Sequence, residues 1–360
     1  MEKIKVMMML SQLNAGGIQK LTIDLASQLN NDEFDVSILC LMPRNGGLFE
    51  KTAEEYGIKV FYLNKRSGMD FSVIPKIFKT LKKYHPDIIH ANQRTLTYAM
   101  LPIIASGIKK VIYTVHNLAD QDAKGLHQKI IKAAHNIFGV TLVAISDLCK
   151  RSISDVYHID EKKIPCIYNG VDINFFASPT ENIKKDIDFI AVGRMSSQKN
   201  YLMMLKAFKQ VQSIYPDAKL TILGDGEKRS EIETFCEENH LSNNVNMPGN
   251  VSNVREYMWR SKVFLMSSDF EGLPITVLEA MAAGLPIVAT KAGGIVDIVE
   301  DNGNGFLVNI GDEEGLAKAM IECLQNDGKM KSYADHSKAL SQKYSIEHCA
   351  NEYMKLYHSL

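Results

Sequence analysis

Two glutamates lie on either side of the predicted start of a short helix. Glu271 and Glu279 belong to the string Glu-Gly-Leu-Pro-Ile-Thr-Val-Leu-Glu-Ala-Met-Ala-Ala-Gly at 271–284. Pro274 suits the first helical position, and Gly284 suits the left-handed residue that ends a helix. The free N–H groups of a helix start bind anions such as phosphate, and carboxylates beside them can accept hydrogen bonds from hydroxyls. The string therefore predicts a nucleotide-sugar site, although two acids that merely face a helix dipole and solvent would have the same spacing.

Two basic residues follow a predicted buried strand in the second half of the chain. Arg194 and Lys199 lie in the string Gly-Arg-Met-Ser-Ser-Gln-Lys at 193–199. Arginine offers a planar fork of donors for phosphate oxygens, and lysine offers a mobile point charge. Because only a short loop separates them, we expect both side chains to reach one diphosphate. Exposed basic residues are often only solvated, but a pair that follows a strand and a glycine is less usual.

Glycines stand at the ends of several predicted strands. Gly16 and Gly17 open a helix after the first strand, and Gly224 and Gly226 follow a later one. Glycine lets the backbone approach a ligand closely, but it also serves ordinary tight turns. The string Met-Pro-Gly-Asn-Val at 247–251 could place backbone amides against a flat base. The Gly-x-Gly-x-x-Gly fingerprint of dinucleotide sites is absent.

Two histidines end predicted strands in the first half. His116 follows the strand at 111–115, and doubly wound folds keep their ligand sites at such carboxyl ends. His116 could therefore exchange a hydrogen bond with a sugar, or it could be a loop histidine without a role. His90 also ends a strand, but a helix start follows it, so we expect a structural role for His90.

These residues must be positioned by an α/β framework. Short runs rich in Val and Ile alternate with longer amphipathic stretches, which is typical of parallel sheets. The expected strands of the first half are 4–10, 36–41, 60–63, 88–91, 111–115 and 142–145. Those of the second half are 189–192, 220–223, 245–247, 263–266, 287–289 and 306–308. Helices are expected between them, for example at 18–29 and 73–84.

The two series of strands predict two doubly wound domains that face each other across a cleft. In such folds ligands bind at the carboxyl ends of the strands. Turn signals at Asn169-Gly170 and Pro179 place the boundary near 165–178. We therefore expect an N-terminal domain at 1–166 and a C-terminal domain at 167–344.

Composition excludes several other classes of protein. The 360 residues carry a net charge of -1, so nothing global favours nucleic acid as a partner. The six cysteines are scattered without a C-x-x-C pair, which argues against a zinc site or a disulfide framework and fits a reducing compartment. No apolar run approaches the roughly 20 residues of a membrane span. The apolar start at 4–10 flows into a glycine turn, as a first buried strand would. We expect a cytoplasmic protein.

Taken together and in this order, these strings resemble the retaining glycosyltransferases of family 4, the group 1 glycosyltransferases, which have the GT-B fold of two Rossmann-like domains. The resemblance runs from Gly16-Gly17 through Asn169-Gly170-Val171-Asp172 to Gly293-Gly294. Its most specific element is the pair of glutamates separated by seven residues, Glu271 and Glu279. Family members also end with a helix that returns to the first domain, and 345–360 has the apolar spacing for one.

The resemblance implies a role for each matching residue around the donor diphosphate and sugar. Gly16 and Gly17 would close on the diphosphate, and Arg194 and Lys199 would neutralise it. His116 would contact the sugar near the anomeric centre. The charge that develops on the leaving nucleoside diphosphate is what these cations would stabilise, so His116, Arg194 and Lys199 are candidate catalytic residues together with Glu271.

The same resemblance assigns the recognition of hydroxyls and base. Glu279 would bind the ribose hydroxyls and Glu271 those of the transferred sugar, which it would orient rather than attack. The remaining donor-binding residues would act largely through their backbone or by close approach; they are Gly224, Gly249, Val251, Gly272, Leu273, Pro274, Ile275 and Thr276. Retention of configuration would follow from attack on the same face of the sugar. No Asp-x-Asp metal string occurs, so we expect neither a metal nor another cofactor besides the nucleotide-sugar co-substrate.

Other functions share this architecture. A nucleotide-sugar 2-epimerase would need carboxylate and histidine acid/base groups in the cleft and would work without an acceptor. Loss of Arg194, Lys199 or the glutamates would favour a non-catalytic nucleotide-sugar-binding protein, and all of them are present. A nicotinamide oxidoreductase is disfavoured by the missing fingerprint. We favour a UDP-sugar donor on frequency alone, with a glycan or polyprenyl-linked saccharide as acceptor in cell-surface polysaccharide biosynthesis.

The first domain also carries local positive charge. Lysines lie on a predicted helix and near it, at Lys76, Lys79, Lys82, Lys83, Lys109, Lys110, Lys124, Lys129 and Lys132. They predict either contact with an anionic membrane, on the inner face of the cell membrane, or an ordinary solvated face.

Overall fold

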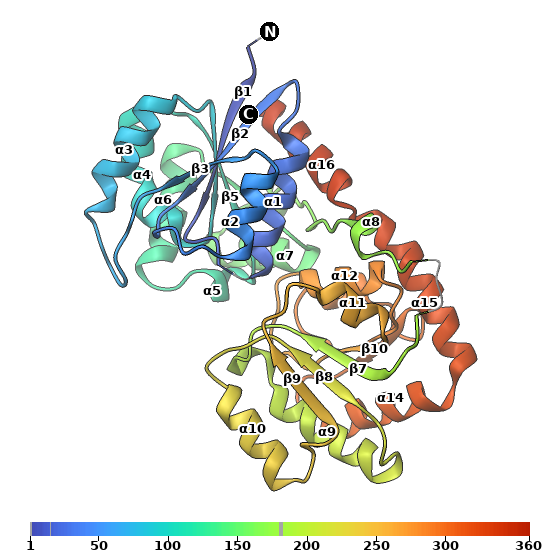
Figure 1. The fold of residues 1–360 in the computed structure, drawn as a ribbon. Coiled ribbons are helices and arrows are strands. Elements are labelled where there is room, and N and C mark those ends of the chain that lie inside the picture. The colour runs from blue at the N-terminus through green and yellow to red at the C-terminus, as the bar shows by residue number, and fades with distance from the viewer. Residues whose placement is uncertain (1, 15, 180–182) are drawn as a thin grey trace. The chain divides into compact units, whose positions relative to one another are not determined.

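The computed structural model describes residues 2–14, 16–179 and 183–360 and divides the chain into two compact units. The N-terminal unit comprises Met1–Gly170 and Ile346–Leu360, and the C-terminal unit comprises Val171–Ser345 (Figure 1). From the sequence we expect the corresponding boundaries after residues 166 and 344.

The N-terminal unit contains a six-stranded parallel sheet of order β3-β2-β1-β4-β5-β6. Its strands are β1 (Ile4–Leu10), β2 (Phe34–Cys40), β3 (Lys59–Tyr62), β4 (Ile88–Asn92), β5 (Lys110–Val115) and β6 (Thr141–Ala144). The apolar run of β1 is fully buried from Val6 to Leu10, because helices cover both faces of the sheet. All carboxyl ends lie at one edge, since every pairing is parallel.

Helices connect the strands of the N-terminal unit. They are α1 (Gly17–Leu29), α2 (Leu48–Glu55), α3 (Val73–Tyr84), α4 (Leu96–Ser106), α5 (Ala119–Asp122), α6 (Leu126–Phe138), α7 (Asp147–Tyr157) and α16 (Ile346–Ser359), with the 3-10 turns η1 (Gln93–Thr95) and η2 (Glu161–Lys163). Helix α3 packs beside α4, and α1 packs beside α16 (Figure 1).

The C-terminal helix α16 belongs to the N-terminal unit and is anchored through buried side chains. Tyr357 Oη lies 2.8 Å from His90 Nδ1, and His90 Nε2 lies 2.8 Å from Thr114 Oγ1. Thr114 Oγ1 also lies 3.0 Å from Tyr353 Oη. Burial lowers the pKa of His90 to about 3, so the imidazole is neutral. His90 therefore has the structural position that we expected.

The C-terminal unit repeats the architecture with a sheet of order β12-β11-β10-β7-β8-β9. Its strands are β7 (Ile187–Val192), β8 (Leu220–Leu223), β9 (Val245–Gly249), β10 (Ser261–Met266), β11 (Ile287–Thr290) and β12 (Gly305–Val308). Its helices are α8 (Ile173–Phe176), α9 (Tyr201–Ile214), α10 (Arg229–Glu238), α11 (Val254–Trp259), α12 (Ile275–Ala282), α13 (Ile295–Ile298), α14 (Glu313–Gln325) and α15 (Asp327–Ser341), with the 3-10 turns η3 (Ser197–Lys199) and η4 (Gln342–Tyr344). The predicted α/β class with two parallel sheets is confirmed. None of the helices within the described ranges is long and apolar enough to cross a membrane.

Candidate active site

Two predicted site residues form a largely buried ion pair at the carboxyl edge of the C-terminal sheet. Lys199 ends η3, which follows β7, and Glu271 lies in the loop between β10 and α12. Lys199 Nζ is 2.7 Å from Glu271 Oε1, and the side chains are 16% and 8% exposed. The edge therefore presents a cation and a carboxylate side by side, which can serve a phosphate and a hydroxyl group respectively.

The two loops that carry this pair are joined by further hydrogen bonds. Gln198 Nε2 donates to the carbonyl of Phe270 at 2.8 Å, and the Asp269 N–H donates to the carbonyl of Gln198 at 2.9 Å. Asn200 Nδ2 donates to Asp269 Oδ1 at 2.8 Å. Because these bonds flank Lys199 on both sides, the ion pair does not depend on two flexible side chains alone, and the site is pre-organised.

Glycines allow the backbones around the site to approach one another. Gly293 has φ +58°, and a Cβ on it would lie 1.7 Å from the carbonyl oxygen of Glu271. Gly224 has φ +127°, and a Cβ there would lie 2.1 Å from the carbonyl oxygen of Gly193. The Gly224 N–H donates to the carbonyl of Gly249 at 2.9 Å, so two predicted donor-binding glycines are neighbours. These positions cannot accept a side chain without movement of the backbone.

Helix α12 starts one residue later than expected, since Pro274 immediately precedes its first residue, Ile275. Glu279 lies inside the helix and is only 5% exposed, so it is not a solvated surface residue. The preceding residues Gly272, Leu273 and Pro274 are buried as well, whereas Thr276 is partly exposed. Gly284 has φ +75°, as expected for the residue that ends the helix.

Arg194 is placed differently from Lys199. Its side chain is 75% exposed, and Nη2 lies 3.0 Å from Glu227 Oε2. The two cations thus make separate ion pairs, and the structure does not bring them to one point. Val251 follows β9 and is half-buried.

The predicted residues of the N-terminal unit lie at the carboxyl edge of its sheet. Gly16 precedes α1, Gly17 is its first residue, and both are exposed. His116 follows β5, and its Nε2 lies 2.7 Å from Asn92 Oδ1. Asn92 Nδ2 donates to the carbonyl of Met9, so Oδ1 faces the imidazole and Nε2 carries the proton.

The remaining nitrogen of His116 is an open acceptor. Nδ1 is buried and has no hydrogen-bond partner within the described part of the chain. Burial lowers the pKa of His116 to about 4, so the ring is neutral near pH 7. It can accept a hydrogen bond from a hydroxyl but does not supply a positive charge there.

Sequence reasoning missed the residues that hold His116. Asp122 Oδ1 accepts the His116 N–H at 3.2 Å, and Asp122 Oδ2 accepts the Tyr113 O–H at 2.7 Å. Burial raises the pKa of Asp122 to about 6. The available signal was a polar residue at the end of β4, Asn92, and an acidic residue in the segment that follows β5, Asp122. No group of three or more His, Cys, Asp or Glu side chains that could hold a metal ion occurs in residues 2–14, 16–179 and 183–360.

Each half of the chain matches a known family of glycosyltransferases. Residues 15–175 match the family described as Glycosyltransferase Family 4, and residues 172–340 match the one described as Glycosyl transferases group 1. The two matches together run from residue 15 to residue 340. The chain is a glycosyltransferase that matches a different family model in each half.

Curated relatives cover most of this glycosyltransferase. The UDP-Gal:alpha-D-GlcNAc-diphosphoundecaprenol alpha-1,3-galactosyltransferase of Escherichia coli is 25% identical over 326 residues, 85% of this chain and 84% of that protein. An alpha-1,4-N-acetyl-D-galactosaminyltransferase of Campylobacter jejuni, whose name gives a PP-undecaprenol-linked acceptor, is also 25% identical and covers 98% of both chains.

Solved structures share the fold. The crystal structure of Anabaena HepE in complex with UDP-glucose superposes with a TM-score of 0.86 at 22% identity, covering 99% of this chain and 100% of that one. At this identity the likeness supports the GT-B fold of the glycosyltransferase and does not by itself assign a ligand.

Proposed function

We propose that this glycosyltransferase moves a sugar from a UDP-sugar, with retention of the anomeric configuration, to a lipid-linked or polysaccharide acceptor in cell-surface polysaccharide biosynthesis. The observation that carries the proposal is the buried ion pair of Lys199 with Glu271 at the carboxyl edge of the C-terminal sheet. Curated relatives named for UDP-galactose and for diphosphoundecaprenol-linked acceptors support the choice of donor and acceptor classes.

In this proposal the C-terminal unit recognises the donor. Lys199 and Arg194 neutralise the diphosphate, and Arg194 exchanges its exposed partner Glu227 for a phosphate oxygen. Glu271 keeps one carboxylate oxygen on Lys199 and offers the other to a hydroxyl of the sugar. Glu279 accepts hydrogen bonds from the ribose hydroxyls. No covalent intermediate is needed, because the groups serve to bind and to stabilise the leaving diphosphate.

The remaining donor contacts use close backbone approach. They involve the residues around the start of α12 and the glycine-lined turns, namely Gly224, Gly249, Val251, Gly272, Leu273, Pro274, Ile275 and Thr276. In the N-terminal unit, Gly16 and Gly17 supply backbone N–H groups at the start of α1. His116 Nδ1 accepts a hydrogen bond from a sugar hydroxyl.

The donor proposal is tested by isothermal titration of UDP and UDP-sugars into the purified protein. Glu279→Gln should weaken UDP binding, whereas Glu271→Gln should weaken the binding of UDP-sugars more than that of UDP. The exposed Lys262, paired with Asp188 at 2.8 Å, provides the matched control Lys262→Met. Donor affinity equal to wild type in both glutamate variants would refute the assignment.

Transfer is separated from the alternatives by the release of UDP. A transferase releases UDP in proportion to an added acceptor, whereas a 2-epimerase converts the donor without one and a binding protein does neither. Proton NMR of the product gives the anomeric configuration, and an inverted product would contradict retention. Activity that survives a metal chelator is expected, since the proposal assigns the diphosphate charge to side chains.

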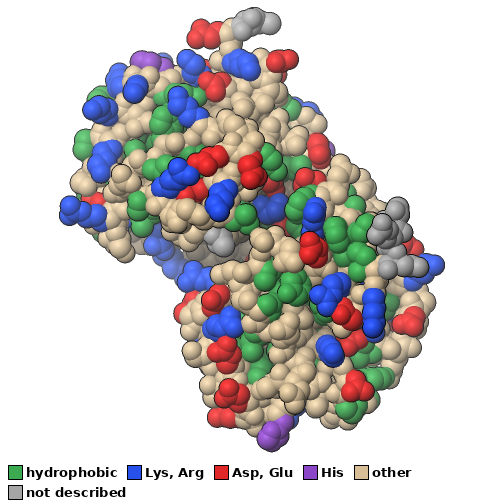
Figure 2. All heavy atoms as spheres, in the orientation of Figure 1, with side chains coloured by type: hydrophobic (Ala, Val, Ile, Leu, Met, Phe, Trp, Pro, Cys, Tyr) green, Lys and Arg blue, Asp and Glu red, His purple; other side chains and the backbone are tan. Residues whose placement is uncertain are grey.

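We further propose that the protein is cytoplasmic and lies against the inner face of the cell membrane through its N-terminal unit. Figure 2 shows Lys and Arg side chains gathered over the side where Figure 1 places α3. Large apolar side chains are exposed nearby, with Phe71 55% exposed before α3 and Leu101 69% exposed on α4. Lysines around exposed apolar side chains suit a surface of anionic lipid.

Liposome sedimentation tests this contact. Binding should increase with the fraction of anionic lipid and should fall when Lys79, Lys82 and Lys83 of α3 are replaced by glutamine. The same number of replacements on the C-terminal unit, at Lys206, Lys209 and Lys318, serves as the control. Sedimentation that is independent of anionic lipid would contradict the proposal.

A further inference from the structure

Arg94 stands at the carboxyl edge of the N-terminal sheet, directly after β4. Gln93 before it has φ +55°, a left-handed conformation that is uncommon for residues other than glycine. The side chain of Gln93 accepts a hydrogen bond from the Ser11 N–H at 3.1 Å, which fixes this turn to the end of β1. On the other side, Asn92 is bonded to His116. Arg94 is therefore held in the same row of loops as the proposed sugar-contacting histidine.

Arg94 is a cation without a carboxylate partner. It is exposed, and no ion pair or hydrogen bond joins its guanidinium to another residue within the described ranges. Its charge nevertheless acts on Tyr113, Asp122 and His127. Of these, Asp122 is already engaged by the Tyr113 O–H and the His116 N–H. The positive charge therefore acts on Asp122, which accepts the His116 N–H, and no carboxylate in the described ranges forms an ion pair with it.

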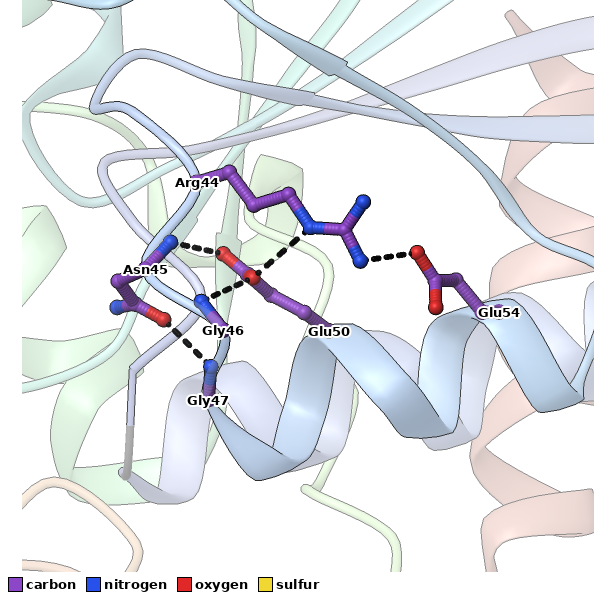
Figure 3. A network of polar contacts seen from close by, with 6 residues as sticks. All are labelled: Arg44, Asn45, Gly46, Gly47, Glu50 and Glu54. Atoms are coloured by element: carbon purple, nitrogen blue, oxygen red, sulfur yellow. Dashed lines mark hydrogen bonds and ion pairs between the residues drawn. The ribbon is translucent and has the colours of Figure 1, made fainter.

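Arg44, at the end of β2 on the same edge, shows the opposite situation. Its Nε lies 3.5 Å from Glu50 Oε2, and it also pairs with Glu54 (Figure 3). Glu50 is 2% exposed and accepts the N–H groups of Asn45 and Gly46 at 2.9 and 2.7 Å. The guanidinium of Arg44 is thus engaged by two carboxylates of the following helix, so it is not available to a ligand.

A second cation lies on the same side as Arg94. Tyr98 follows Arg94 four positions later in the sequence, in the first turn of α4. Lys65, from the loop after β3, places its Nζ 5.1 Å from the centre of the Tyr98 ring. Arg94 and Lys65 thus both follow strands at the carboxyl edge of the sheet, and Lys65 lies against an aromatic ring. Two cations and an aromatic ring at one edge suit a doubly charged group attached to an apolar or sugar moiety.

We propose that Arg94, assisted by Lys65, binds the diphosphate that joins the acceptor saccharide to its lipid. The inference rests on the proposed function and adds the chemical class of the acceptor group and the residue that reads it. The donor also contains a diphosphate, but the cations assigned to the donor lie in the C-terminal unit. The test must therefore separate these two sources of the same chemistry.

The test is a titration of geranyl diphosphate into the full-length protein in the presence of saturating UDP, which fills the donor site. Arg94→Gln should weaken binding about ten- to a hundredfold, the loss expected for a charge-assisted hydrogen bond. Arg94→Lys should retain part of the affinity, and Lys65→Gln should cost less than Arg94→Gln. Arg44→Gln, the same change at a paired arginine, should leave the affinity within about twofold of wild type.

Several results would overturn the inference. Equal affinity of wild type and Arg94→Gln would do so, and so would geranyl diphosphate binding that UDP abolishes, because the ligand would then occupy the donor site. An equal loss of affinity in Arg44→Gln would point to nonspecific attraction by the edge. The affinity for UDP measures the proposed function separately: a wild type that does not bind UDP refutes that function, whereas intact UDP binding with an unaffected Arg94→Gln refutes this inference alone. Matching thermal melts confirm that the variants are folded.

Discussion

Removing one member of the Lys199–Glu271 pair should destabilise the C-terminal unit even without substrate. In Lys199→Met the Glu271 carboxylate, whose side chain is 8% exposed, loses the ammonium group 2.7 Å away. Breaking a buried ion pair costs about 3–5 kcal/mol, because an uncompensated charge remains. Since the lysine side chain is 16% exposed and water can approach it, we expect roughly 2–3 kcal/mol at neutral pH.

The double variant distinguishes a real pair from two independent residues. Glu271→Gln alone should also be destabilising, but Lys199→Met combined with Glu271→Gln should cost less than the sum of the single changes. The expected coupling is about 1–3 kcal/mol, as for residues in direct contact. Lys262→Met provides the control, since it breaks a pair whose lysine side chain is 47% exposed and should cost about 0–1 kcal/mol.

The assay is urea unfolding followed by tryptophan fluorescence. The chain has one tryptophan, Trp259, and its Nε1 donates to the carbonyl of Phe176 at 2.8 Å. Both residues belong to the C-terminal unit, so the signal reports the unit that contains the pair. Additive effects of the two substitutions, with each single change below about 0.5 kcal/mol, would show that the pair contributes nothing and would remove the basis of the donor proposal.

Two further predictions follow from backbone geometry and from buried histidines. Gly293→Ala should destabilise the C-terminal unit by at least about 2 kcal/mol and weaken UDP-sugar binding, because its Cβ would lie 1.7 Å from the Glu271 carbonyl oxygen. Gly311→Ala is the control, since Gly311 also has a positive φ but open space around it. It should cost only about 1 kcal/mol by the same urea measurement. Burial lowers the pKa of His90 to about 3 and that of His116 to about 4, below the value of about 6.5 for an unfolded chain. The stability that this provides is complete above about pH 6.5 and is lost as the pH falls towards about 4. The hydrogen-exchange protection factors of the β4 and β5 amides, which are corrected for the intrinsic pH dependence of exchange, should therefore fall in that window. Protection factors that do not change with pH would contradict the buried, neutral state of these rings.

The strands could be predicted from the sequence because both faces of each parallel sheet are covered. Continuous apolar runs such as Val6–Leu10 are typical of strands that are buried on both faces, and the predicted and observed strands agree within a few residues. The end of the helix before Gly284 could be predicted equally well, since a glycine after an apolar helix commonly adopts the left-handed conformation that it has here.

The pairing within the site could not be predicted in the same way. Lys199 and Glu271 meet because Gln198 is bonded to the carbonyl of Phe270 across a separation of 72 positions. A local pattern contains no information about such a crossing of two loops. The sequence also gave no indication that Arg194 is paired with Glu227, because that contact depends on the direction of an exposed side chain. Asn92-Gln93-Arg94 contains no glycine, the residue type that marks the other predicted ligand-binding loops.

Lys199 is already paired and Arg94 is not paired within the described ranges, so ligands bound at these two residues should respond differently to ionic strength. Lys199 must share its charge between Glu271 and a donor phosphate inside a largely buried site, where mobile ions screen weakly. Arg94 is exposed and unpaired within the described ranges, so an anion bound there interacts through solvent-screened charge. Raising the salt concentration should therefore increase the KM for a diphosphate-linked acceptor more than it weakens UDP binding. If the KM for the acceptor and the affinity for UDP depended equally on salt, the acceptor diphosphate would not be bound by Arg94.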